Sequence, residues 1–395
     1  MAELNRTHLT DLRGASRMAF DATAGLVDVV ERMHSTIQRR PAPVGKAPNR
    51  PTKGITGLVY RSVRGGVRLV GAGVDVSLAS VAGFLPQGKT APGREALLAA
   101  VNGVYGDYLA RTDNPLAIEM SLRARGRGVD VSDPGASYRQ AVGQAPTSKL
   151  LLLVHGLCLN DQHWRRAGHD HGAALADEFG YSPLYVRYNS GLHIHQNGRA
   201  LAELLETLLR NWPVPVQEVC IIGHSMGGLV ARSACLWADE HGHDWLRSLA
   251  KVVFLGTPHH GSPLERGGNG LDFILDLSPY SAPLTRLGKA RSAGIQDLRH
   301  GAIAPDGVRP VALPSGVACY AAGATLEKRR SVLADRLIGD GLVPLNSALG
   351  RHRTRSRALG IPKARQWIGY EMGHLELLCR PEVYAQLRIW LQDHA

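Results

Sequence analysis

The stretch CIIGHSMGG, residues 220–228, decides the fold. An apolar run leads into it, and residues 229–237 after it have the spacing of a helix. A strand, Gly-x-Ser-x-Gly and a helix in this order hold a serine on a sharp turn that stands clear of a sheet. Side chains two residues to either side of the serine would collide, which explains Gly223 and Gly227. We therefore predict that Ser225 is a catalytic nucleophile rather than an exposed serine in a glycine-rich turn.

Strand-like and helix-like segments alternate on both sides of this stretch, which favours a mainly parallel, doubly wound sheet. An antiparallel hairpin over residues 116–131 is expected to open the sheet. Residues 264–313 break the alternation, and we expect them to form a helical cap over the site. The apolar side chains of this cap would face either an acyl chain or the core, and the sequence leaves both open. The other expected strands are residues 150–154, 183–188, 252–255, 316–321 and 365–369, with helices at 198–212 and 381–392.

Residues 1–112 form a different region, expected to be a helical extension of a catalytic domain at 113–395. A proline-rich linker at 39–54 carries five basic residues and no acid, so we expect it to be extended and solvated. Residues 1–147 hold 19 Lys and Arg against 12 Asp and Glu, more than half of the net charge of +12. The extension is either a brace packed on the catalytic domain, which its glycine-rich second helix favours, or an anchor on a membrane or lipid-granule surface.

The 395 residues contain no apolar run of the roughly 18 residues that a membrane-spanning helix needs. The N-terminus lacks a basic stretch followed by an apolar core, so no secretory signal is expected. Five scattered cysteines without metal-ligand spacing indicate free thiols in a reducing compartment, and hence a cytoplasmic protein, with peripheral attachment to a membrane surface left open. We expect no cofactor and no bound metal. No nucleic-acid motif accompanies the basic charge, so we expect no nucleic-acid partner.

A serine nucleophile of this kind needs a histidine base and an acid that orients it, following the serine in the order acid, then histidine. His374 follows the last expected strand, and Asp340 lies in the loop after the strand before it. Loops at the carboxyl ends of parallel strands meet at one edge of the sheet, so we expect both residues near Ser225. Asp335 and Asp297 remain rivals for the acid, although Asp297 lies in the expected cap.

The oxyanion that forms during acyl transfer needs two backbone N–H donors. We expect them from Met226, directly after the nucleophile, and from Leu157, in the loop after the strand at 150–154. Four histidines are expected to surround the substrate without acting as acid or base. His155 would support the oxyanion loop, His224 would pack beside the serine turn, and the remaining two would form the wall of the site: His259 and His260.

Five motifs, VHGLCLN, GHSMGGLVAR, GTPHHGSP, GDGLVP and MGHLELL, occur in this order between residues 154 and 378. Together they resemble the lipase and esterase branch of the α/β-hydrolase superfamily, including bacterial triacylglycerol lipases and GPI-inositol-deacylase-like hydrolases. The resemblance implies an α/β-hydrolase fold and the triad Ser225, Asp340 and His374. Some secreted lipases of this kind follow the histidine with Leu-Asp, whose acid helps to bind calcium. Here Glu376 stands in place of that aspartate with Arg380 close by, a departure from the pattern that disfavours a calcium site.

The sequence therefore predicts a serine esterase or lipase that cleaves carboxylic esters through an acyl-enzyme on Ser225. The same triad serves thioester or polyester hydrolysis and acyl transfer, and the sequence does not separate these reactions. A binding protein on a hydrolase fold is a further alternative, against which the complete set of Ser, Asp and His argues.

Overall fold

The computed structural model describes residues 6–39, 54–82, 92–262, 292–307, 309–328 and 339–392. The chain divides into two compact units, residues 1–91 with 109–117, and residues 92–108 with 118–395. The unit boundary differs from the expected one at residue 112, because residues 92–108 make their contacts with the unit that holds the sheet. The expected linker lies outside the described residues from 40 to 53, and the expected cap lies outside them from 264 to 291.

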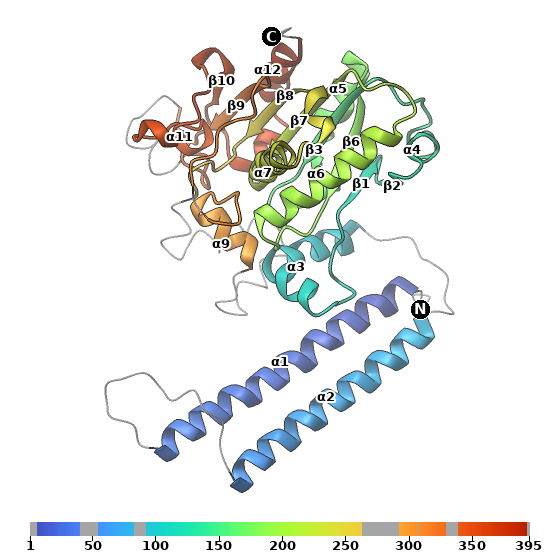
Figure 1. Ribbon diagram of the computed structural model, residues 1–395, viewed down its shortest axis with the longest axis vertical. Coiled ribbons are helices and arrows are strands. Elements are labelled where there is room, and N and C mark those ends of the chain that lie inside the picture. Colours follow the sequence, from blue (N-terminus) through green and yellow to red (C-terminus); the bar gives the residue numbers. More distant parts are fainter. Residues whose placement is uncertain are drawn as a thin grey trace. The chain divides into compact units, whose positions relative to one another are not determined.

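The larger unit is built on an eight-stranded sheet in the order β10-β9-β8-β7-β3-β6-β1-β2 (Figure 1). Six neighbouring strands run parallel, and only β1 and β2 at one edge are antiparallel to their neighbours. This mainly parallel sheet, opened by a hairpin as the sequence predicts, has the arrangement expected for an α/β-hydrolase fold. The strands are β1 (Ser121–Ala124), β2 (Arg127–Val129), β3 (Lys149–Val154), β6 (Ser182–Arg187), β7 (Glu218–His224), β8 (Leu249–Leu255), β9 (Ala318–Ala324) and β10 (Gln366–Gly369).

Helices cover both faces of this sheet, and Figure 1 shows α6 and α7 packed across one of them. The strand β3 sequence KLLLLV explains the two cores, since successive side chains of a strand point to opposite faces. Leu150 and Leu152 pack into the core beneath α6 and α7, whereas Leu151 and Leu153 pack into the core beneath α5 and α12. The helices are α3 (Pro92–Arg111), α4 (Pro134–Val142), α5 (His171–Phe179), α6 (Ile194–Asn211), α7 (Met226–His241), α9 (Ala293–His300), α11 (Leu345–Ala348) and α12 (Pro381–Gln392).

Five elements of this unit were not among the expected ones: the helices α4, α5 and α11 and the short strand pair β4 (Arg165–Arg166) and β5 (His169–Asp170). The helices α4 and α5 have nine residues each, too few for a helical period to stand out from the sequence. Both are instead defined by their ends. Asp133 and Asp170 accept hydrogen bonds from backbone N–H groups of the first turns, and glycines in the left-handed region end the helices.

The smaller unit contains two long helices, α1 (Arg6–Arg39) and α2 (Gly54–Ala82), which contact each other. Asp75 of α2 is buried and accepts two hydrogen bonds each from Arg13 and Arg17 of α1. These two guanidinium groups lower the pKa of the Asp75 carboxyl group. No helix in the described part of the chain is long and apolar enough to cross a membrane.

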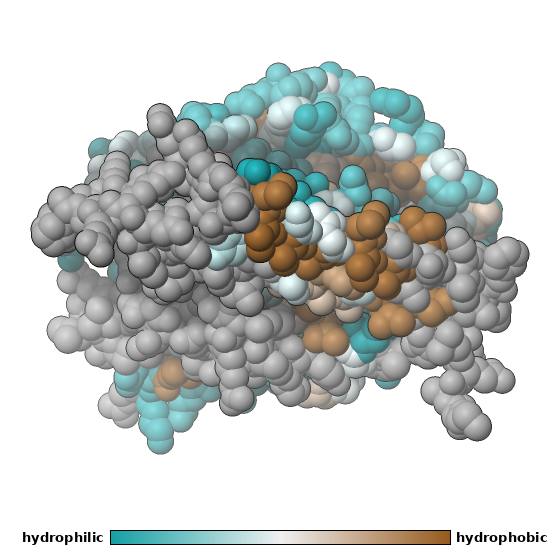
Figure 2. All heavy atoms as spheres, turned by 90° about the horizontal axis from the view of Figure 1, so that it is seen from below, coloured by the Kyte–Doolittle hydropathy of each residue, from teal (hydrophilic) through white to brown (hydrophobic). Residues whose placement is uncertain are grey.

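Apolar side chains also lie on the outside of this helical pair, and Figure 2 shows apolar residues gathered in a band on the face it views. The exposed fraction reaches 76% for Leu69 and 64% for Val76. Large apolar residues that are exposed together, rather than singly, mark a surface that contacts something apolar. The exposed members are Leu12, Leu58, Val59, Val63, Leu69, Val70 and Val76.

Candidate active site

Ser225 lies between the end of β7 and the first residue of α7, with a backbone φ of 54° and ψ of −125°. A non-glycine residue at positive φ is strained by roughly 1–3 kcal/mol, and such strain is concentrated at functional sites. The sharp turn also requires glycine on both sides. A Cβ atom on Gly227 would lie 2.1 Å from the carbonyl oxygen of Val154, and one on Gly223 would lie 2.6 Å from Cα of Gly228. The turn that the sequence predicts around Ser225 is therefore present.

Ser225 and His374 line one cavity, although 149 positions separate them in the chain. Strands β7 and β10 end at the same edge of the sheet, and this brings the loops that follow them together. The rest of the lining is mainly apolar and was not expected from the sequence, because its residues come from loops and helices that lie far apart in the chain. These residues are Cys158, Leu159, Pro258, Ser262, Leu298, Leu342, Val343 and Leu375.

The imidazole of His374 is bound to Asp340. Nδ1 of His374 lies 2.7 Å from Oδ2 of Asp340, and both side chains are buried. A carboxylate accepts, so this contact places a proton on Nδ1 and leaves Nε2 as the basic nitrogen. The backbone N–H of His374 also donates to the carbonyl oxygen of Asp340, at 3.1 Å. The structure thus brings together the predicted base and the predicted acid.

A tight loop fixes the Asp340 carboxylate. Its Oδ1 accepts hydrogen bonds from the N–H groups of Leu342, at 3.0 Å, and Val343, at 2.8 Å. The two carboxylate oxygens therefore have different partners.

Of the two rivals of Asp340 for the orienting acid, Asp335 lies outside the described residues. Asp297 does not contact His374, since its Oδ2 accepts from the N–H of Ile194 at the start of α6 and lies 3.0 Å from Nδ1 of His193.

The two expected oxyanion donors lie at the same site. Met226 is the first residue of α7, where helical geometry leaves the N–H without an intrahelical carbonyl. Leu157 lines the cavity, and the following residue, Cys158, takes a positive φ of 59°. A Cβ atom on Gly156 would lie 3.0 Å from Cβ of Ser225, so only glycine lets this loop approach the serine so closely.

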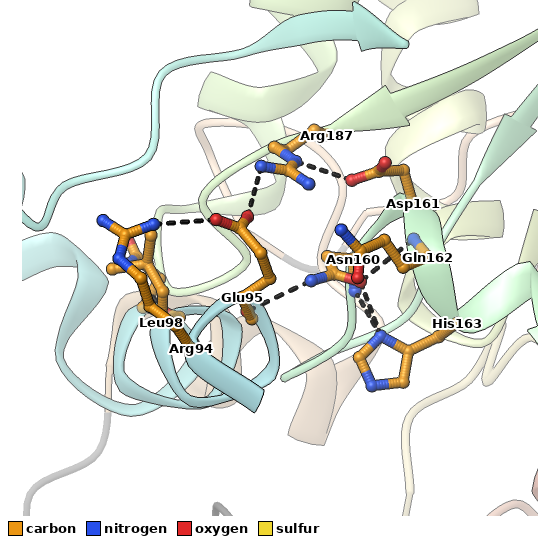
Figure 3. Close-up of polar contacts among 9 residues, drawn as sticks. Arg94, Glu95, Leu98, Asn160, Asp161, Gln162, His163 and Arg187 are labelled. Carbon is orange, nitrogen blue, oxygen red and sulfur yellow. Dashed lines mark hydrogen bonds and ion pairs between the residues drawn. The ribbon is translucent and has the colours of Figure 1, made fainter. Parts of the chain in front are cut away.

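A buried polar network holds the oxyanion loop (Figure 3). Arg187, at the end of β6, donates to Asp161 of the loop and to Glu95 of α3, at 2.6 and 2.5 Å. Asn160 donates through its side-chain amide to the Glu95 carbonyl oxygen, at 3.1 Å. Cys158 donates its N–H to Oγ of Ser190. Because α3 supplies Glu95, this helix is part of the support of the site, which explains why it belongs to the larger unit.

His224 and His155 occupy different positions around the serine. His224 lines the cavity, and its Nε2 donates to the carbonyl oxygen of His374, at 3.2 Å. Burial holds the pKa of His224 well below its usual range, so it is neutral. His155 is absent from the described lining of the cavity. It stacks on Tyr188, with ring centroids 4.2 Å apart, and burial lowers its pKa to about 3. His155 therefore supports the oxyanion loop and does not line the cavity.

His259 and His260 were expected in the wall of the substrate site, and the structure places them elsewhere. Neither belongs to the described lining of the Ser225 cavity, and both line a second cavity. Their neighbour Pro258 lines the first cavity. Consecutive residues of the turn after β8 therefore line different cavities, and sequence position alone does not reveal which cavity each side chain lines.

The carboxylate of Glu376, two residues after His374, already has partners within the protein. Oε2 of Glu376 accepts the N–H of Gly373, at 2.6 Å, and Oε1 lies 3.6 Å from Arg380. Elsewhere in the described residues, ligand atoms of His193, His195 and Asp297 lie within 4.8 Å of one another, a spacing that a metal ion could bridge. There the Asp297 carboxylate already binds the start of α6 and His193.

Residues 149–326 match the family described as PGAP1-like alpha/beta domain. The similar solved structures include a Bacillus licheniformis lipase, BlEst2, in its mature form, at 18% identity over 61% of this chain and 90% of that chain, with a TM-score of 0.40. Its propeptide form gives 18% identity, 64% and 52% coverage and a TM-score of 0.44. An esterase from Thermogutta terrifontis gives 17% identity, 62% and 90% coverage and a TM-score of 0.33. A search of curated proteins finds no match. The resemblance to the α/β-hydrolases drawn from the sequence is confirmed.

Proposed function

We propose that this α/β-hydrolase cleaves carboxylic esters with an apolar acyl group through an acyl-enzyme on Ser225. One observation carries the proposal: Ser225 and His374 line one cavity, and Nδ1 of His374 lies 2.7 Å from Oδ2 of Asp340. The apolar lining of that cavity supports an acyl group as its occupant.

In the proposed reaction, Oγ of Ser225 attacks the ester carbonyl carbon while Nε2 of His374 takes the hydroxyl proton. The N–H groups of Met226 and Leu157 donate to the oxyanion that forms. His374 then returns the proton to the leaving alcohol, and a water molecule repeats the sequence on the acyl-enzyme. Asp340 holds the imidazole with its proton on Nδ1 and stabilises the imidazolium ion.

Turnover of p-nitrophenyl esters from acetate to palmitate tests this proposal and determines the preferred acyl length. We expect hydrolysis by the full chain and a loss of roughly 10⁴-fold or more in kcat for Ser225→Ala. Ser262→Ala is the matched control, because Ser262 lines the same cavity and donates its hydroxyl to the Leu342 carbonyl oxygen. It should keep kcat within a few-fold. Ser225→Ala with more than a few per cent of wild-type turnover would contradict the assignment.

We further propose that the helical extension binds an anionic membrane or lipid-granule surface. The exposed apolar residues of α2 support this, since they lie in the same stretch as three arginines and a single acid, Asp75. Apolar side chains interleaved with basic ones are typical of helices that lie in a lipid interface.

Co-sedimentation with anionic liposomes tests the surface proposal. Wild-type protein should bind and should dissociate as the salt concentration rises. A double variant, Leu69→Ser with Val76→Ser, should lose binding and keep its turnover on a soluble short-chain ester. If the wild type does not bind liposomes and removal of residues 1–53 lowers its melting temperature, the extension is a brace instead.

A further inference from the structure

The second cavity is large and basic. It has a volume of about 790 Å³ and lies within the unit that holds the sheet. Its polar side chains include three arginines, Arg232, Arg309 and Arg357, and four histidines, whereas no Asp or Glu lines it among the described residues. A cavity that is lined by positively charged side chains and holds no acidic one attracts an anion.

Arg232 is a buried cation in this lining. It lies on α7, seven residues after Ser225, and is 6% exposed. One terminal nitrogen donates to the Val311 carbonyl oxygen, at 2.9 Å, and the other lies 3.4 Å from Nδ1 of His259. Its Nε has no partner, and no carboxylate pairs with the guanidinium in the described part of the chain. Burial lowers the pKa of Arg232 to about 10, so the group remains charged at neutral pH. A buried cation without a counter-ion is costly unless an anion or water enters.

One buried histidine extends the donor set. His259 is 3% exposed and accepts the Arg232 contact at Nδ1, which places its proton on Nε2, a nitrogen without a partner. The half-buried His260 does not add a donor, because its ring already hydrogen-bonds the Gly350 backbone and its other nitrogen, Nε2, therefore carries no proton. Burial holds the pKa of His259 well below its usual range and lowers that of His260 to about 4, so both are neutral at pH 7. His352 packs against His260, with ring centroids 4.9 Å apart.

The charges of the arginines indicate what the cavity accepts. Arg309 is already paired with Asp306 and Glu240, at 3.0 and 3.2 Å. The structure pairs neither Arg232 nor Arg357 with a carboxylate among the residues it describes, which leaves two positive charges. A phosphomonoester carries about −1.5 to −2 at pH 7 and three strong acceptor oxygens.

We propose that this cavity is a binding site for a phosphate dianion, either free phosphate or the phosphomonoester group of a larger molecule. The donors approach from three elements, α7, the loop after β8 and the 3-10 helix Arg355–Arg357, which suits a tetrahedral anion better than a planar carboxylate. The site does not take part in the proposed ester cleavage. It adjoins the Ser225 cavity, because Pro258 and His259 are consecutive and line one cavity each.

Calorimetric titration of the full chain with sodium phosphate, at pH 7.5 and constant ionic strength, tests the proposal. We expect saturable binding of one phosphate by the wild type. Arg357→Gln should raise Kd about tenfold, the equivalent of one hydrogen bond to a charged group. The matched control is Arg355→Gln, because Arg355 is exposed in the same turn but does not line the cavity. It should leave Kd within twofold.

A deeper variant and two further anions complete the test. Arg232→Met should abolish phosphate binding, and its thermal stability in phosphate-free buffer shows whether it folds. Acetate should bind at least tenfold more weakly than phosphate. A Kd for glycerol 3-phosphate below that for phosphate identifies the phosphate as part of a larger molecule, such as a lipid headgroup, and equal values identify the free ion. No saturable phosphate binding, or an equal Kd in Arg357→Gln and wild type, would overturn the proposal.

Discussion

Replacement of Asp340 by asparagine tests the proposed orienting acid with almost no change in shape. The loop N–H groups of Leu342 and Val343 both donate to Oδ1 of Asp340. In the variant these two donors select the amide oxygen, so the amide NH₂ faces Nδ1 of His374. Nδ1 must then accept, and the proton of the neutral imidazole moves to Nε2. An imidazole with its proton on Nε2 cannot take the proton of Ser225.

The same contacts give the size of the effect. The productive orientation of the amide would turn its NH₂ toward two buried N–H donors. Leaving each donor unsatisfied costs about 1–3 kcal/mol, so the flipped amide lies roughly 2–6 kcal/mol higher. At 1.4 kcal/mol for each factor of ten, kcat falls between about 30-fold and 10⁴-fold. KM should stay within about threefold, because Asp340 does not line the cavity.

Hydrolysis of p-nitrophenyl butyrate, measured with the melting temperature, decides this prediction. Asp297→Asn is the matched control, because Asp297 binds the start of α6 rather than His374. It should keep kcat within about threefold. If Asp340→Asn kept kcat within fivefold of wild type while folded, or if the two variants exchanged their effects, the proposed role of Asp340 would be wrong.

Three more variants test other parts of the account. Gly156→Ala should lower kcat at least tenfold without unfolding the protein, because its Cβ would lie 3.0 Å from Cβ of Ser225; unchanged turnover would show that the oxyanion loop does not need this approach. Glu95→Gln should lower the free energy of urea unfolding of the larger unit by about 1–3 kcal/mol, because Arg187 loses a buried charged partner. The control Glu203→Gln, in an exposed ion pair, should lower it by under about 0.5 kcal/mol. Equal effects would show that the network does not support the loop. Asp75 has a lowered pKa in the folded protein, so its stabilisation of the α1–α2 pair is present above about pH 4 and is lost as the pH falls below that value. The difference in stability between wild type and Asp75→Asn, followed by circular dichroism from pH 6 to pH 2, should therefore stay constant down to about pH 4 and narrow below it, and parallel curves over the whole range would contradict this.

The sheet and the serine turn could be predicted because their signals are local. Residues 150–154 form one unbroken apolar run, as a strand buried on both faces requires, and the steric demand at Gly223 and Gly227 follows from the turn itself. His374 and Asp340 were also accessible to sequence reasoning, since chain order and strand ends limit where an acid and a base can lie.

Other features depend on contacts between distant segments, which a sequence pattern does not carry. α3 falls within the extension expected at residues 1–112, yet Glu95 joins it to Arg187 across 92 positions. His259 and His260 sit directly after a strand end, as substrate-contacting residues often do. The side on which they lie is set by packing against Phe254 and His352. The basic cavity that they line gave no signal in the sequence.

Covalent labelling tests the central claim most directly. A fluorophosphonate reacts with a serine only when a base and an oxyanion site activate the hydroxyl, so the adduct identifies the nucleophile independently of the natural substrate. Peptide mapping by mass spectrometry should find one adduct, on Ser225 in the wild type, with none in Ser225→Ala and strongly slowed labelling in His374→Ala. An adduct on another residue, or no adduct on folded wild-type protein, would contradict the account.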